Sequence, residues 1–227
     1  MNRSKTNKKV AVLLCGSGFK DGSEIRESVA TLLALSQCGA QYQCFAPDAL
    51  QHHVVNCLTG EPAVGEARNM LVEAARIARG SVRAITELKV SNYDALMIPG
   101  GFGVAKNLCD FASQGSGGHA RLDVADVIQA FHQARKPIGA ICIAPALVAL
   151  TLRGAALELT LGETCEASQE IEKLGHKHIV MSVTECHVDR KNFFVTTPAY
   201  MIDDAPIHEV FSGIEKCVSA VINLTDL

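Results

Sequence analysis

Cys142 is the residue whose place in the sequence points most directly to chemistry. It follows an apolar, strand-like segment, Pro137 to Ile141, and a helix is expected to begin near Ala144-Pro145, where proline fits the first turn. Such a strand–turn–helix elbow lifts one side chain out of a sheet, and the helix N-terminus favours a thiolate over a thiol. We therefore interpret Cys142 as a candidate nucleophile with a lowered pKa. The alternative is a buried structural cysteine, and Cys15 at the end of the first strand is the rival position.

A thiolate nucleophile needs a proton partner and hydrogen-bond donors for developing negative charge. Glu24 and Glu27 are three residues apart at the start of a predicted helix, so they share roughly one face. Acids are also favoured there by the helix dipole alone, and this simpler explanation stays open. The Gly100-Gly101 turn can present a backbone N–H that forms an oxyanion hole with the N–H of Ile143, because glycine leaves no side chain in the way. The alternative is that the two glycines form a plain tight turn.

The histidines offer a weaker signal. His187, next to Cys186, is the candidate third member of the site. The segment His176 to His178 with these two residues matches no tetrahedral metal spacing, so we expect no metal. The loop Gly16 to Gly18 suggests a dinucleotide site only weakly, because its glycine spacing is GxGxxxG and Asp21 would repel a pyrophosphate. We expect no cofactor.

The elements that must position these residues alternate between short apolar runs and helical patterns, which is typical of an α/β fold with a parallel sheet. Ligands then bind beyond the carboxyl ends of the strands, where the loops Gly16 to Gly22, Pro99 to Gly103 and Ile141 to Pro145 begin. The predicted strands are Val10 to Cys15, Gln41 to Ala46, Ala95 to Ile98, Pro137 to Ile141, Ile179 to Val183 and Phe193 to Thr196. The predicted helices are Glu24 to Gln37, Glu66 to Arg79, Leu122 to Ala134, one from about Ala144, and Ile207 to Leu224.

Composition excludes several classes of protein. The net charge of −3 over 227 residues argues against a nucleic-acid binder, and no run of about 18 apolar residues predicts a membrane span. The nine cysteines are scattered without a CxxC pair, which favours reduced thiols and a cytoplasmic location, and no secretory signal is seen. We expect residues 1–9 to be a flexible basic tail and residues 10–227 to be a single domain.

Four motifs in order resemble one known family. They are VLLCGSGFKDGSEIRESV, IPGGFGVAKNL, GAICIAP and VTTPAYM. They are similar to the enhancing lycopene biosynthesis protein family, also called the sigma cross-reacting protein family, over nearly the whole chain. This family is a branch of the PfpI-type superfamily. The resemblance implies a flavodoxin-like, three-layer α/β/α sandwich with a mostly parallel sheet, the class I glutamine amidotransferase-like fold, and a homodimer.

The resemblance also implies roles for individual residues. Cys142 matches the family's elbow cysteine, Gly101 and Ile143 its oxyanion-hole amides, and Glu27 the glutamate beside the thiol, with Glu24 as second choice. PfpI-type peptidases have histidine directly after the cysteine, so Ile143 argues against a peptidase. Some members are glyoxalases without a cofactor, and we expect a low-activity enzyme of this kind that converts small dicarbonyls to hydroxy acids. The alternatives are a redox-sensing or partner-binding protein linked to isoprenoid metabolism, and an amidotransferase-like hydrolase with a cysteine–histidine–glutamate triad.

Overall fold

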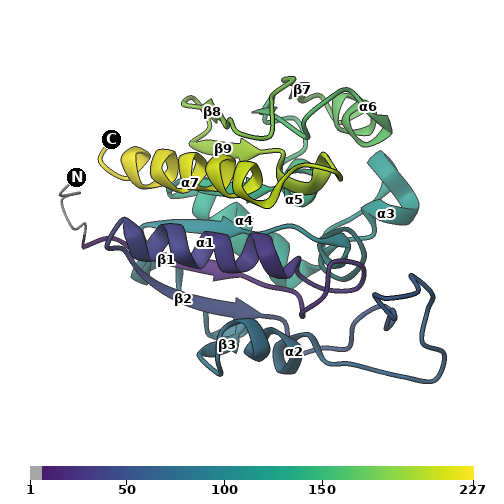
Figure 1. Cartoon of the computed structure of the whole chain (residues 1–227). Coiled ribbons are helices and arrows are strands. Elements are labelled where there is room, and N and C mark those ends of the chain that lie inside the picture. The colour runs from purple at the N-terminus through teal and green to yellow at the C-terminus, as the bar shows by residue number, and fades with distance from the viewer. Residues whose placement is uncertain (1–6) are drawn as a thin grey trace.

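The computed structural model describes residues 7–227, and its centre is a seven-stranded sheet in the order β3-β2-β1-β4-β5-β9-β8 (Figure 1). Neighbouring strands are parallel, except that β8 runs antiparallel to β9. A separate pair, β6 and β7, is also parallel. The strands are β1 (Lys9–Leu13), β2 (Gln41–Ala46), β3 (Val82–Ala84), β4 (Ala95–Ile98), β5 (Ile138–Ile141), β6 (Glu158–Leu159), β7 (Lys177–His178), β8 (His187–Asp189) and β9 (Phe194–Thr197).

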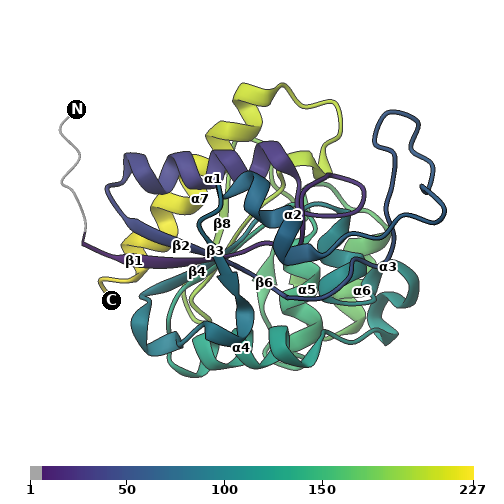
Figure 2. The same ribbon diagram turned by 90° about the horizontal axis from the view of Figure 1, so that it is seen from below.

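Helices cover both faces of the sheet, as Figure 2 shows, with α1 and α7 on one side and α4, α5 and α6 on the other. Each face has its own buried apolar cluster, which explains why the central strands carry apolar residues on both faces. The helices are α1 (Ile25–Gln37), α2 (Met70–Ile77), α3 (Phe111–Gln114), α4 (Leu122–Gln133), α5 (Ala144–Thr151), α6 (Glu166–Lys173) and α7 (Ile207–Leu224). Short helical turns are η1 (Ile85–Glu87), η2 (Val90–Asn92), η3 (Val104–Leu108), η4 (Gly115–Gly117) and η5 (Ala199–Met201).

This arrangement confirms the predicted three-layer α/β/α sandwich with a mostly parallel sheet. The loops that follow β1, β4, β5 and β9 all leave the sheet at its carboxyl edge, because these four strands are neighbours and run in the same direction. A long connection between β2 and α2 reaches away from the body of the molecule at that end (Figures 1 and 2).

Two predicted elements need correction. The strand predicted at Ile179–Val183 is wrong, because β7 ends at His178 and the chain then runs as an irregular connection in which Val180 is 60% exposed. The helix predicted from Glu66 begins only at Met70, because the Asn69 side chain accepts hydrogen bonds from the first free N–H groups of α2.

The predicted basic tail falls mainly on residues outside the described range. Of its last residues, Lys9 begins β1, and Lys8 forms an ion pair with Asp226 at 2.7 Å. These two positions therefore belong to the folded structure and not to a flexible tail.

Candidate active site

Cys142 lies at the sharp turn between β5 and α5, in the strand–turn–helix arrangement that the sequence predicts. Its φ angle is +60°, a left-handed conformation that residues other than glycine rarely adopt. Its backbone N–H donates to the carbonyl oxygen of Thr197 at 3.0 Å, which ties the turn to the end of β9. The residue is 7% exposed and lines a cavity, so the fold holds the sulfur in a confined, accessible place.

Gly100 lets the loop after β4 pass directly against this elbow. A Cβ atom at Gly100 would lie 2.5 Å from Cys142 Cβ and 2.6 Å from Glu27 Oε2, closer than such atoms can approach. The next residue, Gly101, has a φ angle of +103°, which also requires glycine. The Gly-Gly pair is therefore needed to bring a backbone N–H close to the thiol.

Glu27 is the carboxyl group that the fold places beside Cys142. It lies in the first turn of α1 and is completely buried. Its Oε2 accepts a hydrogen bond from Gly100 N at 2.9 Å, and its Oε1 accepts one from Tyr200 N at 3.2 Å. Burial raises the pKa of Glu27 to about 8, and the negative charge of Glu24 acts in the same direction. Glu27 is therefore mostly protonated at neutral pH.

The thiol of Cys142 has a pKa well above its ordinary value. Burial is the main cause, a negative charge on Glu27 raises it further, and the backbone amides of Gly101 and Ile143 act in the opposite direction. The predicted lowering of this pKa is wrong, because desolvation outweighs the helix N-terminus. The thiol and the Glu27 carboxyl are within hydrogen-bonding reach of each other. Two acids in such contact do not both ionise readily. At neutral pH the thiol and the carboxyl therefore both keep their protons, whereas a separate carboxyl would be ionised.

Hydrogen bonding by the backbone N–H groups of Gly101 and Ile143 lowers the pKa of the Cys142 thiol, so both groups lie within reach of the sulfur. They come from different loops, one after β4 and one at the start of α5. These are the two donors that the sequence predicts for an oxyanion hole. Their convergence on the sulfur puts them next to the place where a negative oxygen would form after attack by the thiolate.

Glu24 has a different position from Glu27. It is the N-cap of α1, where its side chain accepts a hydrogen bond from Glu27 N at 2.6 Å. It also lines the cavity, and burial raises its pKa. Glu24 thus fixes the first turn of the helix that carries Glu27 and adds negative charge near it.

The cavity above Cys142 has a volume of about 470 Å³. Tyr200 is a wall residue that the sequence alone did not single out as part of the site. Its N–H holds Glu27, and its hydroxyl accepts a hydrogen bond from Arg26 at 3.1 Å. The motif VTTPAYM, which contains Tyr200 and follows β9, was the sequence feature that could have indicated this residue. The lining residues are Phe19, Lys20, Glu24, Gly101, Phe102, Cys142, Ile143, Ala167, Tyr200, Met201 and Asp203.

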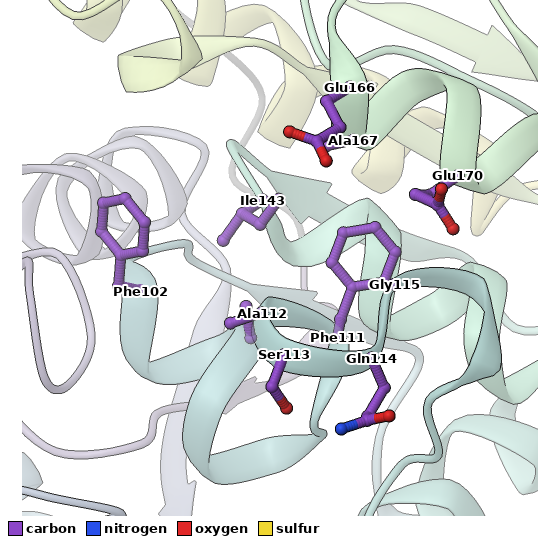
Figure 3. Close-up of a pocket in the computed structure, with 11 residues that line it drawn as sticks. Phe102, Phe111, Ala112, Ser113, Gln114, Gly115, Ile143, Glu166, Ala167 and Glu170 are labelled. Carbon is purple, nitrogen blue, oxygen red and sulfur yellow. The ribbon is translucent and has the colours of Figure 1, made fainter.

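A second cavity of about 470 Å³ adjoins the first, and the two share Phe102, Ile143 and Ala167 as walls. Figure 3 shows it, with the Ile143 side chain between Phe102 and Phe111 in this view, the carboxylate of Glu166 above Ile143 and that of Glu170 at the right. Ile143, the residue after the elbow cysteine, is therefore part of the wall of both cavities.

His187 is not part of this arrangement. It lies on the edge strand β8, and its Nε2 is 3.3 Å from Glu158 Oε2. It is absent from the cavity wall, and no histidine of the described chain lines that cavity. His187, the candidate third member of the site, is therefore placed elsewhere. Its strand, β8, lies two positions from β5 in the sheet, and its side chain lies next to Glu158 of β6.

Cys15, the rival nucleophile, is completely buried. Its Sγ lies 3.5 Å from Ser23 Oγ, and burial raises its pKa to about 12. It does not line the cavity that contains Cys142. All nine cysteines are free thiols.

Two other features are absent from residues 7–227. Within that range no group of three histidine, cysteine, aspartate or glutamate side chains is arranged to hold a metal ion. None of the helices there has the length and apolar character needed to cross a bilayer.

Comparison with known proteins finds relatives that match almost the whole chain. The human "Glutamine amidotransferase-like class 1 domain-containing protein 3, mitochondrial" is 46% identical over 96% of this chain and 83% of its own length. The rat "ES1 protein homolog, mitochondrial" is 44% identical over 96% of this chain and 84% of its own length. No family model matches the sequence. The predicted cytoplasmic location is wrong by this comparison, since both relatives are named as mitochondrial proteins.

Solved structures agree with the fold. An isoprenoid biosynthesis protein with an amidotransferase-like domain from Ehrlichia chaffeensis has a TM-score of 0.88 and 38% identity, covering 95% of this chain and 99% of that one. A glyoxalase III from Candida albicans has a TM-score of 0.57 at 13% identity, covering 96% of this chain and 95% of that one. The second likeness shows a shared fold alone.

Proposed function

Because the chain belongs to the family of the ES1 proteins and the glutamine amidotransferase-like class 1 domain-containing proteins, we propose that its elbow cysteine serves an enzyme of this fold. The proposed reaction converts small dicarbonyls, such as glyoxal or methylglyoxal, into hydroxy acids without a cofactor. One observation carries the proposal, namely that Cys142 lines a cavity of small-molecule size and contacts a buried, protonated Glu27 behind it.

The first step is attack of sulfur on the aldehyde carbon. Cys142 loses its proton to solvent as the C–S bond forms, and Glu27 donates its own proton to the carbonyl oxygen, which gives a hemithioacetal and leaves Glu27 as a carboxylate. The amides of Gly101 and Ile143 stabilise the negative charge that develops on that oxygen. Glu27 suits this exchange because a pKa of about 8 lets it give and take a proton near neutral pH.

The second step moves hydrogen between the two carbons. The Glu27 carboxylate takes the proton from the former aldehyde carbon and returns it to the neighbouring carbonyl carbon, while the hydroxyl proton of the hemithioacetal moves to the oxygen of that second carbon. Glu27 regains its own proton from solvent before the next turnover. One carbon is oxidised and the other reduced, so no external oxidant is needed. The product is a thioester of Cys142, and water cleaves it to the hydroxy acid and the free thiol.

The alternative functions have less support from the geometry. An amidotransferase-like triad needs a histidine near Cys142, and His187 is held at Glu158 instead. A peroxide sensor needs an exposed thiol of low pKa, whereas Cys142 is 7% exposed and its pKa is raised.

The homodimer that the resemblance implies is also a proposal. Ile25, Val29 and Leu33 recur every four residues along α1 and are 47%, 50% and 47% exposed. Such a stripe suits a second copy of the chain. Light scattering of Val29→Glu tests it: we expect a dimer for the unchanged protein and a monomer for the variant, and a monomer in both would contradict the proposal.

The direct test of the reaction is lactate formation from methylglyoxal. We expect the unchanged protein and Cys57→Ser to form lactate at equal rates, because Cys57 is an exposed thiol outside the cavity. Cys142→Ser should fall to the rate without protein. Equal rates for Cys142→Ser and the unchanged protein would refute the proposed function.

A further inference from the structure

A third cavity lies next to the one that contains Cys142. Its volume is about 290 Å³, and Lys20 and Phe102 belong to the walls of both. A molecule bound at the thiol can therefore extend past Phe102 into this space. The remaining wall residues are His53, Val55, Gly60, Pro62 and Lys106.

The charged side chains that line this cavity are the cations Lys20 and Lys106. Lys20 and Lys106 are half-buried, and neither forms an ion pair with a carboxylate among residues 7–227. Lys106 Nζ donates to the carbonyl oxygen of Lys20 at 3.2 Å and lies 5.1 Å from the centre of the Phe102 ring. Its pKa is lowered, mainly by burial and also by the charge of Lys20. Two ammonium groups thus belong to the wall of one small cavity, and that wall carries no carboxylate.

A buried polar network fixes the segments that carry these cations. Asn107, the neighbour of Lys106, donates to Asp21 O at 2.8 Å and accepts from His52 N at 2.8 Å. Gln51 donates to the same Asp21 oxygen at 2.8 Å. The loop after β1, the segment around His53 and the turn η3 are therefore tied together, and the cationic groups are prearranged.

Asp21 is an acid whose charge acts on this cavity, and it limits the positive field without removing it. Its side chain is buried, its Oδ2 accepts from Val55 N at 2.9 Å, and its charge acts on both Lys106 and His53. It does not line the cavity. Asp21 therefore acts as a buried counter-charge outside the cavity, and the cavity itself is lined by two ammonium groups and an imidazole.

We propose that this cavity binds the phosphate group of a substrate whose carbonyl carbon lies at Cys142. The proposal rests on the proposed function, because it assigns the substrate class of that same site. Lys20 and Lys106 supply ammonium donors, and His53 supplies an imidazole N–H. Three donors from three segments suit a tetrahedral, doubly charged anion better than a planar carboxylate, which is matched best by the fork of an arginine.

The test measures binding of inorganic phosphate by calorimetry in a buffer without phosphate. We expect saturable binding to the unchanged protein and at least about tenfold weaker binding to Lys106→Met and to Lys20→Met. Lys89→Met is the matched control, since it removes one charge from an exposed lysine outside the cavity. Acetate at the same concentrations should bind at least about tenfold more weakly than phosphate.

Three results would overturn the proposal: no saturable phosphate binding, equal weakening by Lys89→Met, or acetate binding as tight as phosphate. None of these measurements depends on turnover. A protein that binds phosphate but has no turnover would refute the dicarbonyl reaction and support the anion site. A protein that turns over dicarbonyls but does not bind phosphate would support the reaction and refute the anion site.

Discussion

The carboxyl group of Glu27, on α1, reaches the thiol of Cys142, at the elbow after β5, and a negative charge on the carboxyl raises the pKa of the thiol. Two backbone N–H groups, from Gly100 and Tyr200, hold the carboxyl in this position. The side chain that would donate a proton is thus fixed by the backbone of two other loops. The segments that follow four neighbouring strands, β1, β4, β5 and β9, therefore bring the carboxyl and the thiol together as one coupled pair.

Replacing Glu27 by glutamine should remove proton transfer while keeping the shape of the side chain. We expect dicarbonyl turnover to fall by about 10²–10⁴-fold, the range typical of a lost general acid–base group. Glu24→Gln is the control, because glutamine keeps an oxygen to cap α1 and the pair at Cys142 remains. Steady-state kinetics would check this. A larger loss in Glu24→Gln than in Glu27→Gln would show that the wrong carboxylate has been assigned.

Stability should depend on pH through Glu27. Burial raises its pKa from 4.5 to about 8, so between these values the folded protein keeps a proton that the unfolded chain has lost. The free energy of unfolding therefore falls as pH rises through this window, by up to about 1.4 kcal/mol per pH unit, and this contribution is complete only below pH 4.5. Urea unfolding at pH 5, 6, 7 and 8 measures it.

Glu27→Gln supplies the reference for that measurement, since glutamine does not titrate. The stability difference between the variant and the unchanged protein should shift steadily in favour of the variant as pH rises from 5 to 8. Parallel curves would mean that Glu27 titrates at an ordinary pKa in the folded protein.

Much of the sheet could be predicted because its strands are buried on both faces. Ala95–Ile98 and Ile138–Ile141 are apolar throughout and end at glycine-rich or elbow motifs, so the sequence marks both. The inference from an apolar run to a strand was wrong at Ile179–Val183. This run follows the two-residue strand β7 and stays outside the sheet. Strands as short as β6 and β7 carry too few residues for any periodicity.

The site was only partly readable from the sequence. Glu24 and Glu27 share a helical face, and the choice between them depends on where α1 begins. Glu24 is the cap, so Glu27 turns inward. Tyr200 N and Glu27 meet through the packing of η5 against α1, which no local pattern records. His187 is similar: its partner, Glu158, comes from a strand that the sequence did not reveal.

Gly100 should tolerate no larger side chain. Gly100→Ala would place a methyl group within 2.8 Å of three atoms of Cys142, Glu27 and Ile141, and such overpacking costs typically about 1–3 kcal/mol. Gly117→Ala is the matched control, because a Cβ there meets nothing within 4 Å. Urea unfolding and turnover would both be measured. We expect a lower free energy of unfolding and a lower turnover rate in Gly100→Ala, and no change in either quantity in Gly117→Ala. Full activity of Gly100→Ala would contradict the close contact of the loop with the pair.

Alkylation of Cys142 should reveal the charge of Glu27 directly. At pH 9 Glu27 is mostly ionised, and its negative charge disfavours the thiolate that reacts with iodoacetamide. Glu27→Gln removes this repulsion but leaves the burial, so alkylation at pH 9 should be about tenfold faster in the variant. At pH 6 Glu27 is protonated, and the two proteins should react at similar rates. Mass spectrometry gives both rates, with the exposed Cys57 as internal reference in each sample. A ratio of variant to unchanged protein that stays constant from pH 6 to pH 9 would mean that the two residues do not share a proton.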